Sequence, residues 1–301
     1  MIYTVTLNPA IDYVVGVDKI KTGTVNRTSE EQVFFGGKGI NVSRVLSELG
    51  VKSVATGFIA GFTGKALKEE MKSLCIETLF TELPDGFSRI NIKIKSDEET
   101  EINGQGPAVS EEYLDKFLDS LSVLKNGDVL VLAGSVPKSV PDNIYEIIME
   151  RFSDKGIKFV VDASGGLLTK VLPLKPYLIK PNHIELGEIF GVEINTPDEA
   201  EIYARKLQSM GAMNVIVSMA EKGALLVDEN GERHFCEALK GEVINSVGAG
   251  DSMLAGFLAG IERRENSDYA LKLGTASGGA TAFSSDLAKK EMIEKLFSKL
   301  C

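Results

Sequence analysis

Residue types that often carry chemistry are scarce in this chain of 301 residues. It has no tryptophan, only 2 histidines and only 3 cysteines. Because the cysteines are odd in number and widely scattered, they predict neither a disulfide framework nor a metal cluster, and they favour a reducing, cytoplasmic setting. With His183 and His234 as the histidines, a zinc site at standard spacing is excluded.

Positive charge and long apolar segments are also lacking. The formal net charge is −10, whereas binding to a nucleic-acid backbone needs concentrated Lys and Arg. No apolar run approaches the roughly 20 residues that span a bilayer, and the first residues do not read as a signal peptide. We therefore expect neither nucleic acid nor a membrane as a partner. A small phosphorylated substrate is still compatible with this charge, because it needs only a few local cations.

From about Asp128 onward, short β-branched runs alternate with helix-length segments. Nearly continuous apolar strands separated in this way predict a mostly parallel sheet with helices on both faces. One helix can be placed in detail: Thr196 and Glu199 form a capping box around Pro197, and Gly211 is positioned to end the helix. The apolar runs lie at residues 129–132, 159–161, 177–179 and 215–217.

The first third of the chain has a different pattern. Residues 12–18 and 88–95 alternate between apolar and polar side chains, which is typical of strands with one wet face. Such strands predict a small exposed sheet beside the main one. We expect a single α/β domain over residues 1–301, doubly wound, with a small β-sheet lid built from about residues 11–35 and 86–106.

The segment 36–41 reads Gly-Gly-Lys-Gly-Ile-Asn and precedes an apolar helical stripe. Its glycines therefore lie just ahead of a helix N-terminus, where free N–H groups and the helix dipole favour an anion. Lys38 can add a charge and Asn41 can hydrogen-bond a hydroxyl. The alternative is a tight turn in which Gly36 and Gly37 only satisfy the backbone.

The segment 246–251, Ser-Val-Gly-Ala-Gly-Asp, repeats this arrangement before a helix that is apolar almost all round. Asp251 lies where that buried helix begins, and a simple capping role is the alternative. A carboxylate beside an anion site repels the anion unless a metal or a proton transfer is involved. An Asp here can take a proton from a hydroxyl while the N–H groups stabilise a transferring phosphoryl group.

Two further segments lie between the glycine motifs. Residues 180–185 read Lys-Pro-Asn-His-Ile-Glu, and residues 218–223 read Ser-Met-Ala-Glu-Lys-Gly. Asn182 and Glu185 also fit a helix capping box, and residues 218–223 also fit a strand-to-strand turn in which Gly223 supplies an unusual backbone angle. Both alternatives stay open on the local pattern alone.

Together and in this order, the four segments resemble the signatures of the ribokinase-like carbohydrate kinases, the PfkB family. The resemblance covers the whole chain and implies an ATP-dependent kinase that uses Mg²⁺. It implies Asp251 as the catalytic base, with Gly248, Ala249 and Gly250 beside it. It implies nucleotide binding by Lys180, Asn182, Ser218, Glu221, Gly223, Ala249 and Gly250, and Mg²⁺ binding by Glu185 through water.

The opening residues 6–12 and the segments 85–91 and 102–107 are similar to the phosphosugar branch of the family, and most similar to the members that phosphorylate fructose 1-phosphate at its 6-hydroxyl. Many family members carry Asp at the place of Asn245, in a loop that can bind a monovalent cation, so activation by K⁺ is doubtful here. The resemblance also makes a homodimer through the lid reasonable.

The acceptor side is expected to hold a phosphate and sugar hydroxyls. Arg89 lies on the polar face of an expected strand, where its planar fork can bind a phosphate with two hydrogen bonds. Ser135 and Lys138 follow an apolar strand, at the usual place of an α/β ligand crevice. The full expected set on this side is Asp12, Arg27, Gly36, Gly37, Lys38, Asn41, Arg89, Asn91, Ser135 and Lys138. For Arg27, a solvated surface charge is the alternative.

Two rival functions are retained. The acceptor can instead be tagatose 6-phosphate or fructose 6-phosphate, because moving the phosphate to the other end of a ketohexose changes pocket geometry more than residue type. A protein of another class, a non-catalytic sugar-phosphate sensor, can keep the same fold. The presence of Asp251 speaks against the sensor, since a sensor has no need of a base.

Overall fold

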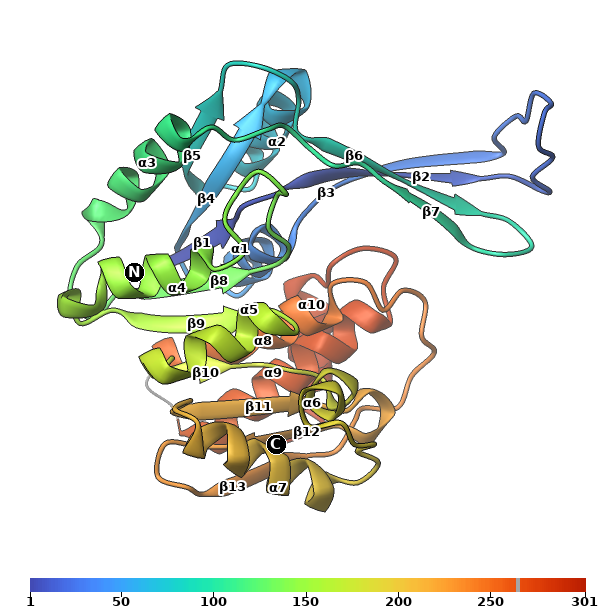
Figure 1. The fold of residues 1–301 in the computed structure, drawn as a ribbon. Helices are drawn as coiled ribbons and strands as arrows, with labels where there is room; N and C mark the ends of the chain where they lie inside the picture. Colours follow the sequence, from blue (N-terminus) through green and yellow to red (C-terminus); the bar gives the residue numbers. More distant parts are fainter. Residues whose placement is uncertain (264–265) are drawn as a thin grey trace.

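A computed structural model describes residues 1–263 and 266–301 of the chain. Within these residues the strands form two sheets, one with 9 strands and one with 4 (Figure 1). The large sheet runs through the body of the molecule, and the small sheet projects from it as a long arm (Figure 1). The expected α/β fold, with helices on both faces of the large sheet and a small second sheet, is confirmed.

The strand order of the large sheet defines where a ligand can bind. Its neighbouring strands are parallel except at the edge, where β12 and β13 run antiparallel. From β1 the chain builds the sheet outward through β4 and β5, and it then returns to the other side of β1 with β8. Ligands of open α/β sheets bind at the carboxyl ends of the strands where the order reverses in this way. In spatial order the strands are β13 (Arg233–Cys236), β12 (Ala224–Val227), β11 (Asn214–Ser218), β10 (Leu178–Ile179), β9 (Lys158–Asp162), β8 (Val129–Ala133), β1 (Ile2–Thr6), β4 (Ser53–Ala60) and β5 (Glu77–Leu83).

Helices bury both faces of this sheet, as its nearly continuous apolar strands require. One face is covered by α1 (Lys38–Glu48), α2 (Gly61–Ser73), α8 (Ala249–Glu262), α9 (Ser267–Ala282) and α10 (Lys290–Phe297). The other is covered by α3 (Glu111–Ser120), α4 (Ile144–Arg151), α5 (Gly166–Val171), α6 (His183–Phe190) and α7 (Pro197–Ser209). The capping box of Thr196 and Glu199 is present at the start of α7, as predicted. In the part of the chain that the structure describes, no helix has both the length and the hydropathy of a membrane span.

The small sheet is assembled from two excursions of the chain. Its order is β3 (Glu30–Gly36), β2 (Ala10–Gly16), β6 (Arg89–Lys95) and β7 (Thr100–Asn103). Ala10 is paired with both Gly36 and Arg89. Because β2 follows β1 closely and β3 leads directly into α1, these paired residues mark the inner end of the small sheet. The strands therefore bring Arg89, Asp12 and Asn91 to the crevice at the carboxyl end of β1.

Candidate active site

Each glycine motif starts a helix, as the sequence predicts. Gly37 is the N-cap of α1, and Gly248, with φ of 78°, is the N-cap of α8. A Cβ atom on Gly39 would lie 2.6 Å from the backbone oxygen of Val5 and 2.6 Å from Thr6 Oγ1. Only glycine therefore lets the first turn of α1 lie this close to β1. The Ile40 N–H donates a hydrogen bond to Thr6 Oγ1 at 3.0 Å, which fixes the start of the helix against the strand.

A direct hydrogen bond joins the two motifs. Asn41 Nδ2 donates to Asp251 Oδ2 at 2.8 Å. Asp251 lies in the first turn of α8 and is 6% exposed. Residues that are distant in the sequence are therefore in contact in the fold, and the carboxylate is held by the helix that follows the first glycine motif.

A second carboxylate, Asp162, lies beside Asp251 and was not among the residues expected from the sequence. It ends β9, is 1% exposed, and forms ion pairs with Lys38 Nζ at 3.0 Å and Lys180 Nζ at 3.2 Å. The signal that could have identified it is its position immediately after an apolar parallel strand, where ligand sites of α/β proteins lie. Lys38 and Lys180, expected on opposite sides of the reaction, thus meet at one carboxylate.

The charges in this cluster perturb one another in opposite directions. Burial, and after it repulsion from Asp162, raise the pKa of Asp251 to about 6 against the hydrogen bond from Asn41 and the attraction of Lys38 and Lys180. Burial also opposes ionisation of Asp162, but Lys180 and Lys38 overcome it and lower the pKa of Asp162 below its ordinary value. Asp162 is therefore the permanent anion of the cluster, and Asp251 is a carboxylate that can gain or lose a proton near neutral pH.

The start of α8, where the sequence predicts an anion site, has a cation beside it. A Cβ atom on Gly250 would lie 3.2 Å from Lys180 Nζ, so the ammonium group lies next to the first turn. The Ala249 N–H donates to Ser246 O at 3.2 Å. The N–H groups of Gly250 and Asp251 belong to the first turn, where a helix cannot satisfy them itself. Of the N–H groups expected to bind the phosphoryl group, Ala249 is thus already engaged within the loop.

Three residues expected to bind the acceptor lie at the inner end of the small sheet. Asn91 Nδ2 donates to Asp12 Oδ1 at 2.7 Å, and a Cβ atom on Gly36 would lie 3.3 Å from Asp12 Oδ2. Arg89 Nε donates to the backbone oxygen of Asn8 at 3.1 Å, which orients its guanidinium group. Within residues 1–263 and 266–301, Asn91 Oδ1 is buried and has no hydrogen-bond partner. A buried acceptor atom without a donor is costly, and a sugar hydroxyl can supply one.

The two segments expected to bind the nucleotide lie next to each other in the fold. Asn182 and Glu185 form the capping box of α6, with Asn182 N–H donating to Glu185 Oε2 at 2.9 Å. A β-bridge links Asn182 with Ser218. Gly223, with φ of 98°, ends the turn between β11 and β12, while Glu221 within that turn is exposed. Both structural alternatives, the capping box and the turn, are therefore present.

Three of the residues expected to bind the acceptor lie away from the charged cluster. Arg27 is exposed in the loop 17–29 between β2 and β3, at the outer end of the arm in Figure 1. Ser135 and Lys138 are exposed in the loop after β8. Ser135 directly follows Gly134, where a Cβ atom would lie 3.6 Å from Lys38 Cβ, so this loop borders the cluster without entering it.

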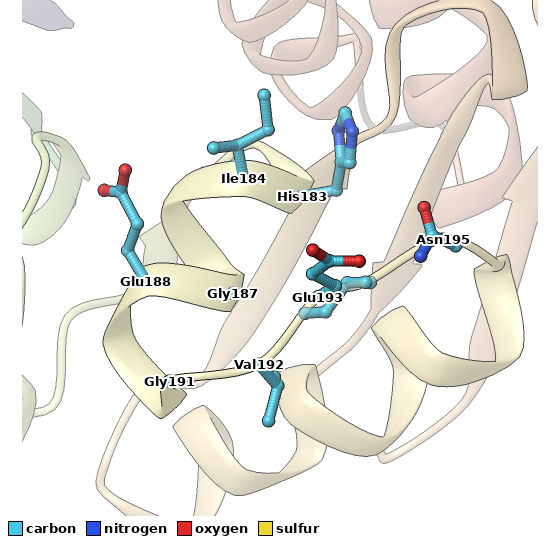
Figure 2. Close-up of a pocket in the computed structure, with 9 residues that line it drawn as sticks. His183, Ile184, Gly187, Glu188, Gly191, Val192, Glu193 and Asn195 are labelled. Carbon is cyan, nitrogen blue, oxygen red and sulfur yellow. The ribbon is translucent and has the colours of Figure 1, made fainter.

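A cavity beside α6 is distinct from the cluster. It has a volume of about 490 Å³, and its lining includes His183, Ile184 and Glu193 (Figure 2). The side chains around it come from α6 and from the segment that leads to α7 (Figure 2). It shares none of Asp251, Asp162 and Lys180, so we do not regard it as the reaction centre.

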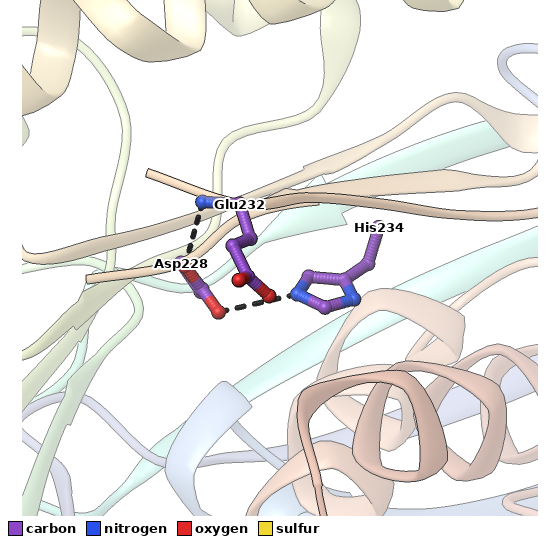
Figure 3. A group of neighbouring side chains, drawn as sticks. All are labelled: Asp228, Glu232 and His234. Carbon is purple, nitrogen blue, oxygen red and sulfur yellow. Dashed lines mark hydrogen bonds and ion pairs between the residues drawn. The ribbon is translucent and has the colours of Figure 1, made fainter. Parts of the chain in front are cut away.

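A group of side chains at the turn between β12 and β13 could in principle hold a metal ion. Asp228, Glu232 and His234 offer ligand atoms within 4.8 Å of one another (Figure 3). Asp228 Oδ1, however, accepts the backbone N–H groups of Asn230 at 3.0 Å and Glu232 at 2.9 Å, and its Oδ2 lies 3.2 Å from His234 Nε2. These contacts close the turn, and we assign the group this structural role.

The fold and the cluster define a class of protein, an α/β phosphotransferase with a buried carboxylate at an anion-binding helix start. Residues 4–292 match the pfkB family of carbohydrate kinases. A 1-phosphofructokinase of Bacillus subtilis is 48% identical over 100% of this chain and 98% of that protein. A D-tagatose-1-phosphate kinase of Bacillus licheniformis is 36% identical over 100% of this chain and 98% of that protein. The chain belongs to the pfkB family.

A solved structure agrees with this assignment. Phosphofructokinase-2 of Escherichia coli, in complex with substrates and products, superimposes with a TM-score of 0.92 and 26% identity, over 99% of each chain. The similarity therefore extends over both sheets. The family resemblance stated from the four segments is confirmed, and with it the assignment as a carbohydrate kinase.

Proposed function

We propose that this kinase transfers the γ-phosphoryl group of ATP to the 6-hydroxyl of fructose 1-phosphate, giving fructose 1,6-bisphosphate and ADP. The observation that supports this proposal most strongly is the hydrogen bond from Asn41 to Asp251, a buried carboxylate of raised pKa in the first turn of α8. The full-length identity of 48% to a 1-phosphofructokinase supports this choice of sugar.

In this reaction Asp251 accepts the proton of the 6-hydroxyl. The N–H groups of Gly250 and Asp251 bind the oxygens of the phosphoryl group in transfer, and Lys180 adds a positive charge beside them. Lys38 is paired with Asp162 in the same cluster, so we assign it to the transferring phosphoryl group rather than to the phosphate of the sugar. No covalent intermediate is needed, since positioning and charge stabilisation supply the catalysis.

The sugar phosphate is bound at the small sheet. Arg89 Nε donates a hydrogen bond to Asn8 O. The two terminal nitrogens of its guanidinium group are the proposed ligands of the 1-phosphate. Asp12 and Asn91 bind hydroxyls of the ring, with Asn91 Oδ1 accepting from one of them. The small sheet then acts as a lid that keeps water from the phosphoryl group.

Mg²⁺ accompanies ATP in this proposal, and the residues present fit it. Carboxylate oxygens are its preferred protein ligands, usually with several waters retained. Glu185 uses Oε2 to cap α6, and its second oxygen can bind a metal-bound water. The ion, when bound, neutralises charge on the nucleotide phosphates.

The deciding experiment is a comparison of kcat/KM for fructose 1-phosphate, fructose 6-phosphate, tagatose 6-phosphate and tagatose 1-phosphate, measured as ADP release. We expect fructose 1-phosphate to be preferred by at least tenfold. A clear preference for another sugar phosphate would overturn the choice of acceptor. The absence of ADP release with every one of them would favour the sensor.

We also propose that the apolar face of the lid is buried in a homodimer. Val33 and Ile102 lie on the two edge strands of the small sheet, β3 and β7, and are 53% and 57% exposed. Light scattering after size exclusion tests this proposal. A dimer that becomes monomeric in Val33→Glu is expected, and a monomeric wild-type protein would refute it.

A further inference from the structure

One face of α1 carries three polar side chains, and the reaction scheme uses only the first of them. Asn41, Arg44 and Glu48 follow one another at spacings of three and four residues, so they lie on the same side of the helix. Asn41 reaches Asp251, while Arg44 and Glu48 reach the loop between α9 and α10. A single helix thus contacts three separate points near the end of the chain.

Arg44 makes the most extensive of these contacts. Its Nη2 lies 2.7 Å from Asp286 Oδ2 and its Nη1 donates to Asp286 Oδ1 at 3.4 Å, which gives a forked ion pair. Nη1 also donates to the backbone oxygen of Phe35 at 3.3 Å. Phe35 belongs to β3 and immediately precedes Gly36, which borders Asp12. One guanidinium group therefore holds both the inner end of the lid and the loop that contains Asp286.

The last residue of α9 and the loop after it together hold the segment in front of α8. The N–H groups of Ile244 and Asn245 donate to Ala282 O at 2.8 and 3.2 Å, and Asn245 Nδ2 donates to Ser285 O at 3.2 Å. Leu287 presses against the helix start, since a Cβ atom on Gly248 would lie 2.7 Å from its Cδ2. The loop therefore contacts both the segment before α8 and the start of the helix that carries Asp251.

We propose that Arg44 is a positioning residue that couples the acceptor end of the lid to the start of α8. Its fork on Asp286 fixes the loop, and its bond to Phe35 O fixes the strand that brings Gly36 to Asp12. The distance between the sugar hydroxyl and Asp251 then depends on one side chain that touches neither substrate. The planar fork is what makes Arg suited to this task, because Lys cannot bind a carboxylate and a carbonyl with the same geometry. The catalytic part of this inference rests on the proposed function.

The chain offers a matched control. Glu48 lies one turn further along α1 and pairs with Lys289 Nζ at 2.8 Å, in the same loop region. It also accepts the Lys290 N–H at 3.2 Å. This pair links the same helix to the same part of the chain, but it has no contact with the lid. If any contact between α1 and this loop is enough to explain the effect of Arg44, Glu48→Gln should show the same effect. If the effect requires the contact with the lid, Glu48→Gln should not show it.

The experiment compares Arg44→Met and the milder Asp286→Asn with Glu48→Gln. Misplacing reacting groups by about 1 Å can cost about a hundredfold in rate. We therefore expect kcat for the sugar phosphate to fall by at least about tenfold in Arg44→Met and Asp286→Asn. The KM of ATP should stay within about twofold of the wild-type value. Arg44→Lys should recover only part of the loss. Glu48→Gln should keep wild-type kinetics. Unchanged kcat in Asp286→Asn, or an equal loss in Glu48→Gln, would overturn the proposal.

Hydrogen exchange provides a readout that does not depend on the identity of the sugar. In Arg44→Met we expect faster exchange both in the residues around Phe35 and in residues 244–248, and in Glu48→Gln in neither. Faster exchange in only one of the two segments would refute the coupling. If the wild-type protein fails to phosphorylate fructose 1-phosphate, the proposed function fails, while these exchange rates still decide whether Arg44 joins the two segments.

Discussion

Replacing Asp251 by Asn should separate the chemistry of this site from its stability. Asn has nearly the same shape, and its side-chain oxygen can still accept the hydrogen bond from Asn41 Nδ2. It cannot accept the proton of a hydroxyl. A positioned general base contributes about 10² to 10⁴ in rate, which corresponds to about 3 to 5 kcal/mol at 1.36 kcal/mol per factor of ten. Turnover should fall by that amount, while binding of both substrates changes little.

Stability should change in the opposite direction. Folding raises the pKa of Asp251 from 3.8 to about 6, so the folded state holds this proton more tightly than the unfolded state. Below about pH 4 the Asp251 carboxyl is protonated in both the folded and the unfolded state. As the pH rises from about 4 to about 6, the unfolded state releases this proton first, so the folded state loses stability. At 1.36 kcal/mol per factor of ten in proton affinity, the ionised carboxylate costs on the order of 3 kcal/mol at neutral pH. Asp251→Asn should relieve part of that cost.

The assays are ADP release for turnover and urea unfolding at pH 5 and pH 8 for stability. The variant should be more stable than the wild type at pH 8, and the difference should shrink at pH 5, where Asp251 is largely protonated. Asn182→Ala, which removes a cap on a different helix, serves as a variant whose effect on stability should not depend on pH in this way. Turnover within tenfold of the wild type would refute the assignment of the base.

Two further predictions concern neighbours of the base. Arg89→Ala should raise the KM of the sugar phosphate by at least about tenfold, since a charged hydrogen-bonded contact contributes about 1.5 to 3 kcal/mol, and equal effects on the KM of ATP would contradict its place on the acceptor side. Asp162→Asn removes the charge that repels Asp251 and frees Lys38 and Lys180 to attract it, so the pKa of Asp251 should fall and the acid limb of the pH–rate profile should move to lower pH. An acid limb that moves to higher pH would be inconsistent with the charges described. The same variant removes the anion that pairs with Lys38 and Lys180, so its free energy of unfolding should be lower by about 3 to 5 kcal/mol.

The architecture could be predicted because local and global signals agree in this sequence. Alternating residues in 88–95 predicted a strand with one wet face, and the continuous apolar run 159–161 predicted a central parallel strand. Both signals reflect how much of each strand is buried, which is a property of neighbouring residues. The capping box at Thr196 and the two glycine helix starts are equally local, and the structure contains all of them.

Contacts between distant segments could not be predicted in the same way. Asp162 is one carboxylate after one strand, and its role emerges only when the fold places Lys38 and Lys180 on either side of it. Arg44 and Asp286 are separated by 242 residues, and neither residue has a distinctive local pattern. Arg27 was expected near the site because of its charge, but the length of β2 and β3 carries it to the outer end of the lid.

The reversal of strand order beside β1 has a consequence for how the protein is made. The residues proposed to bind the acceptor belong to the first excursions of the chain, whereas Asp251 and the loop that contacts its helix follow much later in the sequence. A nascent chain therefore contains the proposed acceptor residues long before it contains Asp251. Because α8 is buried against α1 and α9, the step that completes the catalytic cluster is also the step that closes one face of the large sheet, so catalytic competence and completion of the core arrive together.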